Sequence, residues 1–130
     1  VGGCYRQHLE VIAQELQSTS LPLFIPCPNA RLQMGKNREI YIPKPMKGRG
    51  PKDRQMMTRM YEFLGQLMGL AIRTTSYMAL NFSAVVWKPL VSARIEVGDI
   101  EEIDQLVWQT VDKIFNLERD SEKKQGEFDK

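Results

Sequence analysis

Apolar residues recur at helical spacing in several stretches of the chain, and these stretches predict its main helices. The first stretch predicts a helix over residues 5–18, because its apolar positions are separated by four, three and four residues: Tyr5, Leu9, Ile12 and Leu16. A wider stripe predicts a central helix over residues 53–74, with Asp53 as its N-cap. The apolar positions of that stripe are Met56, Met60, Phe63, Leu64, Leu67, Met68, Ala71 and Ile72.

The last third of the chain predicts shorter helical pieces. Ser83 can cap a short helix that Pro89 limits to one or two turns and that is buried through Val86, Trp87 and Leu90. Residues 94–97 are expected to be extended. Asp99 has the spacing of an N-cap whose acidic partner is Glu102, so helices are expected from there to residue 116. Their inward positions would be Ile103, Leu106, Val107, Val111, Ile114 and Phe115.

Two short apolar stretches between the first and the central helix predict strands, over residues 23–25 and 39–42. Pro26 and Pro28 cannot donate to a β-ladder, so the first strand must be short or lie at an edge. The two strands are expected to form a small hairpin or β-arm with a long connection. The fold class that follows is mostly α (α+β), with a two-stranded β-arm between the first and second helices.

Gly65 and Gly69 interrupt the central helix, four residues apart on one ridge. Two glycines in a helix interior cost about 2 kcal/mol of helix propensity, so their absence of side chains must be useful. We expect them to mark a structural helix crossing, at which a second segment comes into close contact with the backbone. The membrane-dimer motif shares this spacing, but Glu62, Gln66 and Arg73 argue against a membrane helix.

Composition indicates one small soluble domain, and charge divides it unevenly. The 130 residues are 42% hydrophobic and 26% charged, which are ordinary globular values. Residues 1–95 carry 13 basic and 5 acidic side chains, whereas residues 96–130 carry 5 basic and 11 acidic ones. This asymmetry fits either two solvated faces or a basic docking surface near residues 44–59. The chain lacks an initiator Met and a signal peptide, so we expect a piece of a longer chain.

The chemistry-bearing residues form no convincing catalytic or metal site. Cys4 and His8 are within helical reach of each other, but no orienting carboxylate accompanies them. Cys27 lies between two prolines beside an apolar stretch and is expected to be buried and inert. With one histidine and two cysteines, we expect no metal site and no cofactor. Phosphate-loop patterns and aromatics interleaved with the basic loop are both missing, so nucleic acid is not expected as a partner.

Six sequence blocks in order resemble the N-terminal lobe of HECT-type ubiquitin ligases, and most closely the large HERC subfamily. The blocks are GG-x-YR-x5-IAQEL, LPLFIPCPN, NREIYIPKP, YEFLGQLMGLAIRT, LNFSAVVWKPLV and IEEID. The resemblance implies that residues 1–117 are a partial N-lobe, in its large helical subdomain. Residues 118–130 would be a charged tail that frays.

The resemblance also implies the function and partners of the parent protein. Such a protein receives ubiquitin from a ubiquitin-conjugating enzyme on a cysteine, as a thioester, and passes it to lysines of substrate proteins. That cysteine belongs to a C-terminal lobe, so no catalytic residue is expected in this chain, which alone would be inactive. The alternative is a stand-alone α-helical interaction module that docks through the basic loop 44–54.

One binding site can be carried over from the family in part. Some members bind a second ubiquitin through the strands that match residues 23–26 and 39–43, which here would use Ile25, Pro26, Ile40 and Ile42. Pro26 stands where those relatives show a tyrosine. The alternative is that the strands only close the core. The expected location is cytoplasmic, and any membrane or Golgi association would come from elsewhere in the parent.

Overall fold

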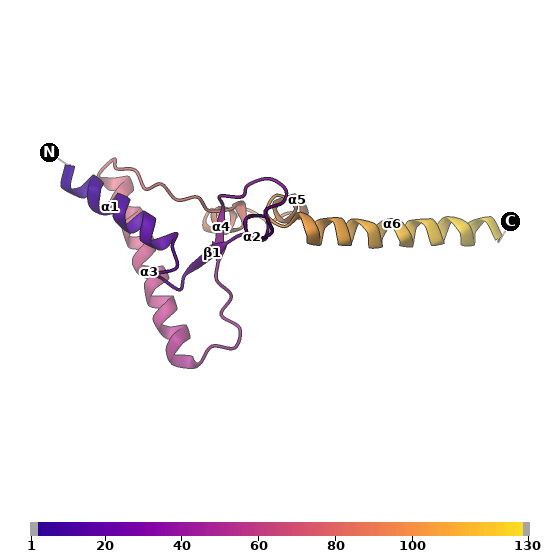
Figure 1. The fold of residues 1–130 in the computed structure, drawn as a ribbon, viewed down its shortest axis with the longest axis horizontal. Coiled ribbons are helices and arrows are strands. Elements are labelled where there is room, and N and C mark those ends of the chain that lie inside the picture. Colours follow the sequence, from indigo (N-terminus) through magenta and orange to yellow (C-terminus); the bar gives the residue numbers. More distant parts are fainter. Residues whose placement is uncertain (1–2, 129–130) are drawn as a thin grey trace.

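A computed structural model describes residues 3–128 and is mostly helical, with one small antiparallel sheet. The elements follow the order α1 (Gly3–Leu16), β1 (Phe24–Pro26), α2 (Pro28–Leu32), β2 (Tyr41–Pro43), α3 (Pro51–Arg73), α4 (Ala84–Leu90), α5 (Val97–Glu101) and α6 (Gln105–Phe128). Figure 1 shows α1 beside α3 at one end and α6 projecting alone at the other. The predicted fold class is therefore confirmed.

The main core lies where α1, β1 and α3 meet the segment before α4. Its buried members are Leu16, Leu23, Phe24, Met57, Leu64 and Phe82. The rings of Phe24 and Phe82 stack with centroids 4.1 Å apart, and Tyr61 packs edge-on against Phe24 at 5.7 Å. The Tyr61 hydroxyl donates to the carbonyl of Leu23, and burial raises the pKa of this phenol. Aromatic packing thus fixes α3 against β1.

The β-arm has the predicted antiparallel pairing, with Ile25 opposite Ile42. β1 is shifted by one residue from its predicted range, and β2 starts two residues and ends one residue later than predicted. The connection contains a short helix, α2, that the turn-rich sequence did not predict. Pro28 occupies the first turn of α2, where a missing N–H costs nothing. β2 also bridges to Phe82, so it lies between β1 and the segment leading into α4.

Several predicted helix boundaries are wrong. The N-cap of α3 is Gly50, with Pro51 in the first turn, and Asp53 lies inside the first turn. The N-cap of α5 is Glu96, so Asp99 is its third helical residue and accepts a hydrogen bond from the Glu96 N–H at 2.8 Å. Residues 94–97 form no strand. Ser83 occupies the predicted N-cap position of α4, but its side chain makes no capping hydrogen bond.

The C-terminal helix differs from its prediction in length. α6 runs without interruption from Gln105 to Phe128, whereas the sequence predicted a helical end near residue 116. Glu, Lys, Arg and Gln dominate residues 118–125, and these are good helix formers, so no breaker stops the helix. Fraying of this tail in solution stays a prediction.

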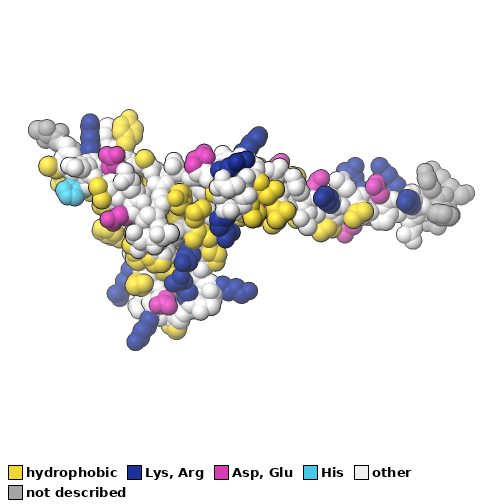
Figure 2. All heavy atoms as spheres, in the orientation of Figure 1, with side chains coloured by type: hydrophobic (Ala, Val, Ile, Leu, Met, Phe, Trp, Pro, Cys, Tyr) yellow, Lys and Arg dark blue, Asp and Glu magenta, His cyan; other side chains and the backbone are white. Residues whose placement is uncertain are grey.

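Fewer of the apolar side chains are buried than the sequence predicted. Trp87 is 37% exposed and Leu90 64% exposed, so α4 is only partly covered, and Phe115 on α6 is 61% exposed. On α3 the most buried residue is Met57, which the predicted stripe left out, while Ile72 is 80% exposed. The apolar faces of these helices extend beyond the partners that the described residues provide (Figure 2).

The predicted crossing at Gly65 and Gly69 does not occur within residues 3–128. A Cβ atom placed on either glycine would have no neighbour within 4 Å outside its own helix. α1 packs through Leu16 and Ile12 against the core that contains Met57 and Leu64 of α3. No segment within residues 3–128 therefore overlies the two glycines, contrary to the prediction.

Candidate functional site

The cysteines and the histidine do not form a nucleophile–base pair. Nδ1 of His8 lies 2.6 Å from the carbonyl oxygen of Cys4, so the ring bonds to the backbone and not to the thiol. Cys27 has no exposed surface, and its Sγ lies 3.3 Å from the carbonyl oxygen of Asn37. Among residues 3–128 no group of three or more His, Cys, Asp or Glu side chains could hold a metal ion. The geometry therefore does not support nucleophilic catalysis by the thiolate of Cys4 or of Cys27.

The β-arm presents β1 as its outer strand. β2 is held on both sides, because the Tyr41 N–H donates to the carbonyl of Asn81 at 2.7 Å and the Cys27 N–H donates to that of Ile40 at 2.9 Å. A hollow of about 300 Å³ lies beside β1, and Ile25 and Pro26 help to line it. The outer edge of β1 is therefore the accessible side of the arm.

The four strand residues predicted as a ubiquitin contact separate into two pairs. Ile25 and Pro26 lie at the hollow beside β1. Ile40 and Ile42 are half-buried and pack against the second core cluster, which is formed by Cys27, Ala30 and Ile103. Ile25 is as half-buried as Ile40 and Ile42, and Pro26 is exposed, so the first pair differs by its place at the hollow.

Asn29 is the polar centre that attaches α6 to the β-arm. Its side chain is almost fully buried, with 1% of the residue exposed. Nδ2 donates to the carbonyls of Lys36 at 3.0 Å and Glu102 at 3.1 Å, and Oδ1 accepts from the Gln105 N–H at 2.8 Å. Gly35 turns closely around this amide: a Cβ there would lie 2.9 Å from Nδ2 in a left-handed backbone conformation, so only glycine fits without strain. Sequence reasoning missed this residue.

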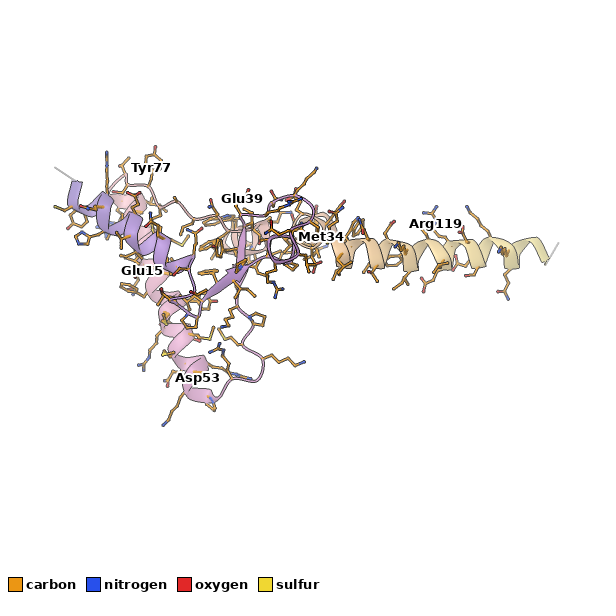
Figure 3. The ribbon with its side chains drawn as sticks, in the orientation of Figure 1. Glu15, Met34, Glu39, Asp53, Tyr77 and Arg119 are labelled. Carbon is orange, nitrogen blue, oxygen red and sulfur yellow. The ribbon has the colours of Figure 1, made fainter. Side chains whose placement is uncertain are left out.

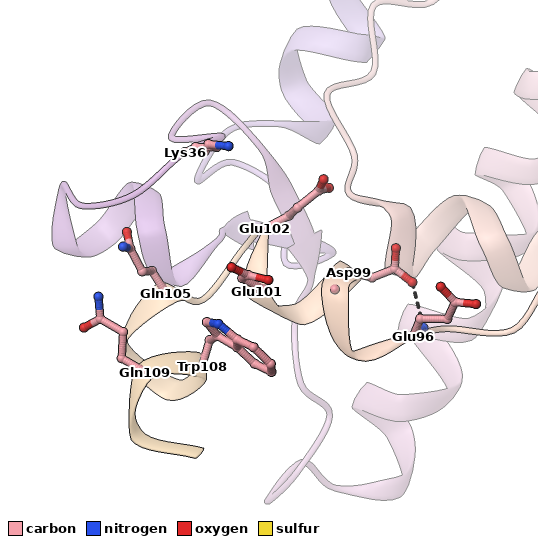
Figure 4. A pocket seen from close by; sticks show the side chains of 9 residues that line it. Lys36, Glu96, Asp99, Glu101, Glu102, Gln105, Trp108 and Gln109 are labelled. Carbon is pink, nitrogen blue, oxygen red and sulfur yellow. Dashed lines mark hydrogen bonds between the residues drawn. The ribbon is translucent and has the colours of Figure 1, made fainter. Parts of the chain in front are cut away.

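An acidic hollow of about 630 Å³ lies where α5 meets α6 (Figure 4). Its charged lining residues are Lys36, Glu96, Asp99, Glu101 and Glu102. The excess of acidic residues after position 95 is the sequence signal for this surface. Its carboxylates are solvated, apart from that of Asp99.

Asp99 is the one carboxylate of this hollow with two close partners. Its Oδ2 accepts from Nζ of Lys88 at 2.7 Å, which ties α5 to α4. The hydrogen bond from the Glu96 N–H, followed by the one from Lys88, lowers the pKa of Asp99. The bond to Asp99 in turn raises the pKa of Lys88. These groups make a structural link.

The predicted basic loop 44–54 is split by the fold. Residues 51–54 belong to the first turn of α3, and residues 44–50 form the connection from β2. Figure 2 shows Lys and Arg side chains gathered around this end of α3, which Figure 3 marks with Asp53. The basic groups therefore continue from the loop onto the first turns of a helix.

An apolar surface accompanies those basic groups on α3. Met56 is 49% exposed and Phe63 57% exposed, although the helix buries Met57 completely. A hollow of about 340 Å³ lies here, lined by Lys52, Gln55, Met56, Arg59, Met60 and Phe63. On the opposite flank, Gly65 borders another apolar hollow, of about 350 Å³. Both flanks of α3 thus carry apolar surface that the described residues leave uncovered.

None of the helices within residues 3–128 is both long and apolar enough to cross a lipid bilayer.

Comparison with known proteins identifies the family. The HECT-domain (ubiquitin-transferase) family matches residues 10–129. The human E3 ubiquitin-protein ligase HERC2 is 38% identical over 104 residues, which are 80% of this chain and 2% of that protein. The human probable E3 ubiquitin-protein ligase HECTD4 is 31% identical over 121 residues, covering 92% of this chain and 3% of that protein.

A more distant relative is the E3 ubiquitin-protein ligase TOM1 of Saccharomyces cerevisiae, which is 24% identical over 131 aligned positions. The alignment covers 92% of this chain and 4% of the yeast protein, so the chain spans only a few per cent of the length of the curated relatives it matches. No solved structure matches it. Because the family match extends over nearly all of its residues, the chain belongs to the HECT-domain family of ubiquitin transferases.

Proposed function

We propose that this chain is a scaffold part of the HECT N-lobe and does not itself carry ubiquitin. The observation that carries this proposal is the family match over residues 10–129 in a stretch whose two thiols are poorly placed for transfer. Cys27 is fully buried, and Cys4 is exposed without a base, because His8 bonds to its carbonyl oxygen. The stand-alone docking module is not favoured, since the match is to a catalytic domain.

The parent protein would transfer ubiquitin in two steps. A cysteine thiolate outside this chain attacks the thioester carbonyl of a ubiquitin-conjugating enzyme, so that a new thioester forms and the enzyme's thiol leaves. The amine of a substrate lysine then attacks this thioester, an isopeptide bond forms, and the cysteine thiol is released. The partners are therefore a ubiquitin-conjugating enzyme, ubiquitin and substrate proteins. The similarity to HERC2, HECTD4 and TOM1, which are named as ubiquitin-protein ligases, supports this assignment.

Thioester formation tests the proposal. The 130-residue chain and a chain with a complete HECT domain are each incubated with ubiquitin, ATP, activating enzyme and conjugating enzyme, then separated without reductant. We expect a ubiquitin adduct that dithiothreitol removes on the complete domain and none on the 130-residue chain. An adduct on the short chain that Cys4→Ser or Cys27→Ala abolishes would show that the scaffold role is wrong. A complete domain without any adduct would exclude the ligase function.

We also propose that the outer edge of β1 contacts a second ubiquitin. The hollow beside β1, with Ile25 and Pro26 in its lining, supports this site, whereas the packing of Ile40 and Ile42 gives them a role in the core. Titration of the chain into isotopically labelled ubiquitin should shift ubiquitin resonances, and Ile25→Ala should weaken binding. Tyr77→Ala, at a residue that is 90% exposed on another segment, is the matched control. Equal binding by both variants would exclude the site.

A cytoplasmic location is part of the same proposal. Both cysteines are free thiols, Cys4 exposed and Cys27 buried, which suits a reducing compartment. Fractionation of cells that express the complete protein should recover it with cytosolic markers. Recovery within secretory compartments would contradict the assignment.

A further inference from the structure

α3 carries two parallel rows of apolar residues, and only one of them is buried. Met57, Leu64 and Ala71, spaced by seven, are buried against the core. Met56, Phe63 and Leu70 precede them by one position each and are 49%, 57% and 37% exposed. The second row therefore lies along the exposed flank of the helix, outside both core clusters of the described residues.

The second row belongs to a regular heptad pattern. Met60 and Leu67 are half-buried and fall between its members, so the apolar positions 56, 60, 63, 67 and 70 alternate steps of four and three. This spacing produces a continuous seam that packs against another helix. A helix-sized partner suits it better than a small molecule, because the hollow at its start is an open surface between side chains of one helix face.

A basic edge runs beside this seam on the side away from the core. Lys52, Arg59 and Arg73 occupy equivalent heptad positions, with the neutral Gln66 between the last two. All three are exposed, and the ion pair found among residues 3–128 is the one between Lys88 and Asp99, so none of these three is neutralised there. An acidic edge on the partner helix would complement them.

The charges disfavour a second copy of the chain as the occupant. Two α3 helices packed antiparallel along this seam would bring their basic edges together, and like charges at such positions are destabilising. A parallel arrangement would place the basic edge of one helix against the side of the other that Met57 and Leu64 bury in the core. The seam therefore requires a helix of different sequence.

We propose that this seam seats an amphipathic helix with acidic residues along one edge, contributed by another part of the same HECT protein. The inference rests on the scaffold function proposed above. The relatives support an intramolecular source, because the matched stretch is only 2–3% of HERC2 and HECTD4 and leaves nearly all of those proteins to supply such a helix. The seam on α3 is then the surface through which this chain acts as a scaffold.

Designed peptides provide the probe. An amphipathic peptide with Leu at its a and d positions and Glu at e and g is compared, by fluorescence anisotropy, with a peptide that has Lys in place of Glu. The 130-residue chain should bind the Glu peptide at least about tenfold more tightly, and added salt should weaken that binding. The double variant Arg59→Glu with Arg73→Glu should reverse the preference, and Phe63→Ala should weaken both peptides. Glu62→Lys, on the opposite flank of α3, is the charge control. Circular dichroism checks that each variant is folded.

Competition with the complete HECT domain tests the source of the helix. The Glu peptide should bind the complete domain at least about tenfold more weakly than it binds the 130-residue chain, because the seam is already occupied. Equal binding to both would mean that the seam is free for a separate protein, and would overturn the inference. Absence of peptide binding, equal affinity for the Glu and Lys peptides, or a dimer in sedimentation that Phe63→Ala dissociates would also overturn it.

Failure of this inference and failure of the proposed function give different results. If the complete domain forms a ubiquitin thioester while the seam stays open, only the inference about the seam fails. If the seam binds the acidic helix but no thioester forms, the ligase function fails and the docking surface remains.

Discussion

Removal of the Asn29 side chain amide should detach α6 from the β-arm. Asn29→Ala deletes two donated hydrogen bonds, to the carbonyls of Lys36 and Glu102, and one accepted from the Gln105 N–H. A net hydrogen bond contributes about 1 kcal/mol, and a buried group left without a partner costs about 1–3 kcal/mol. Because Asn29 is only 1% exposed, water cannot readily reach the backbone groups that lose their hydrogen bonds to its amide. We expect a loss of about 3 kcal/mol in the free energy of unfolding.

Urea denaturation followed by circular dichroism measures this loss. The control is Asn116→Ala, which removes the hydrogen bond from Nδ2 of Asn116 to Asp112 on the exposed side of α6 and should change stability by less than about 0.5 kcal/mol. Hydrogen exchange adds a local measurement, because the amide of Gln105 should lose protection in Asn29→Ala. An effect of Asn29→Ala no larger than that of the control would refute the view that this amide holds the junction together.

Three further changes test the packing and the charges. Met57→Ala should cost about 2–5 kcal/mol by thermal unfolding, since the residue has no exposed surface, whereas Met56→Ala should cost less than about 1 kcal/mol; similar losses would contradict the assignment of the two rows. Gly65→Ala should stabilise the 130-residue chain by about 0.5–1 kcal/mol, because nothing lies within 4 Å of the added Cβ, and a loss would indicate a close neighbour. The lowered pKa of Asp99 means that its contribution is present above the ordinary carboxyl pKa and is lost as pH falls through the folded value; the raised pKa of Lys88 means that its contribution is lost only as pH rises through that higher value. Asp99→Asn should therefore lower the melting temperature at neutral pH and have little effect in strong acid, and a deficit independent of pH would contradict the role of the ion pair.

The sequence predicted the positions of the helices and strands better than it predicted which of their side chains are buried. Helical spacing located α1, α3 and α4, and alternating prolines and apolar residues located the β-arm. Periodicity identified a wide apolar stripe on α3 but could not say which part of it meets the core, because that depends on where α1 and β1 lie. This is why Met57 was missed and why Phe63 was expected to be buried.

Capping and turn signals were ambiguous for a local reason. Glu96 and Asp99 are three residues apart, as are Asp99 and Glu102, so the same spacing fits two helix starts. The short helix α2 starts at Pro28, in a stretch where proline and asparagine predict turns equally well. Only the packing of the chain selects between these alternatives.

The candidate surfaces were even harder to predict from the sequence, because they depend on tertiary structure. Asn29 is an ordinary turn residue in the sequence, and its role arises only because residues 36 and 102–105 fold around it. The basic edge of α3 could be predicted from the spacing of Lys52, Arg59 and Arg73 by seven and fourteen residues, but that prediction requires knowing that the adjacent apolar row is exposed. The function itself was indicated by the order of sequence blocks and not by any catalytic group.

The most direct test of the scaffold account is the rate of ubiquitin loading when both thiols of this segment are removed. In a chain with a complete HECT domain, Cys4→Ser combined with Cys27→Ala should leave the rate of thioester formation within about twofold of the unmodified domain, provided that circular dichroism shows it folded, because neither thiol is placed to take part. Loss of the thioester in a folded double variant would contradict the account, because the segment would then hold the cysteine that carries ubiquitin.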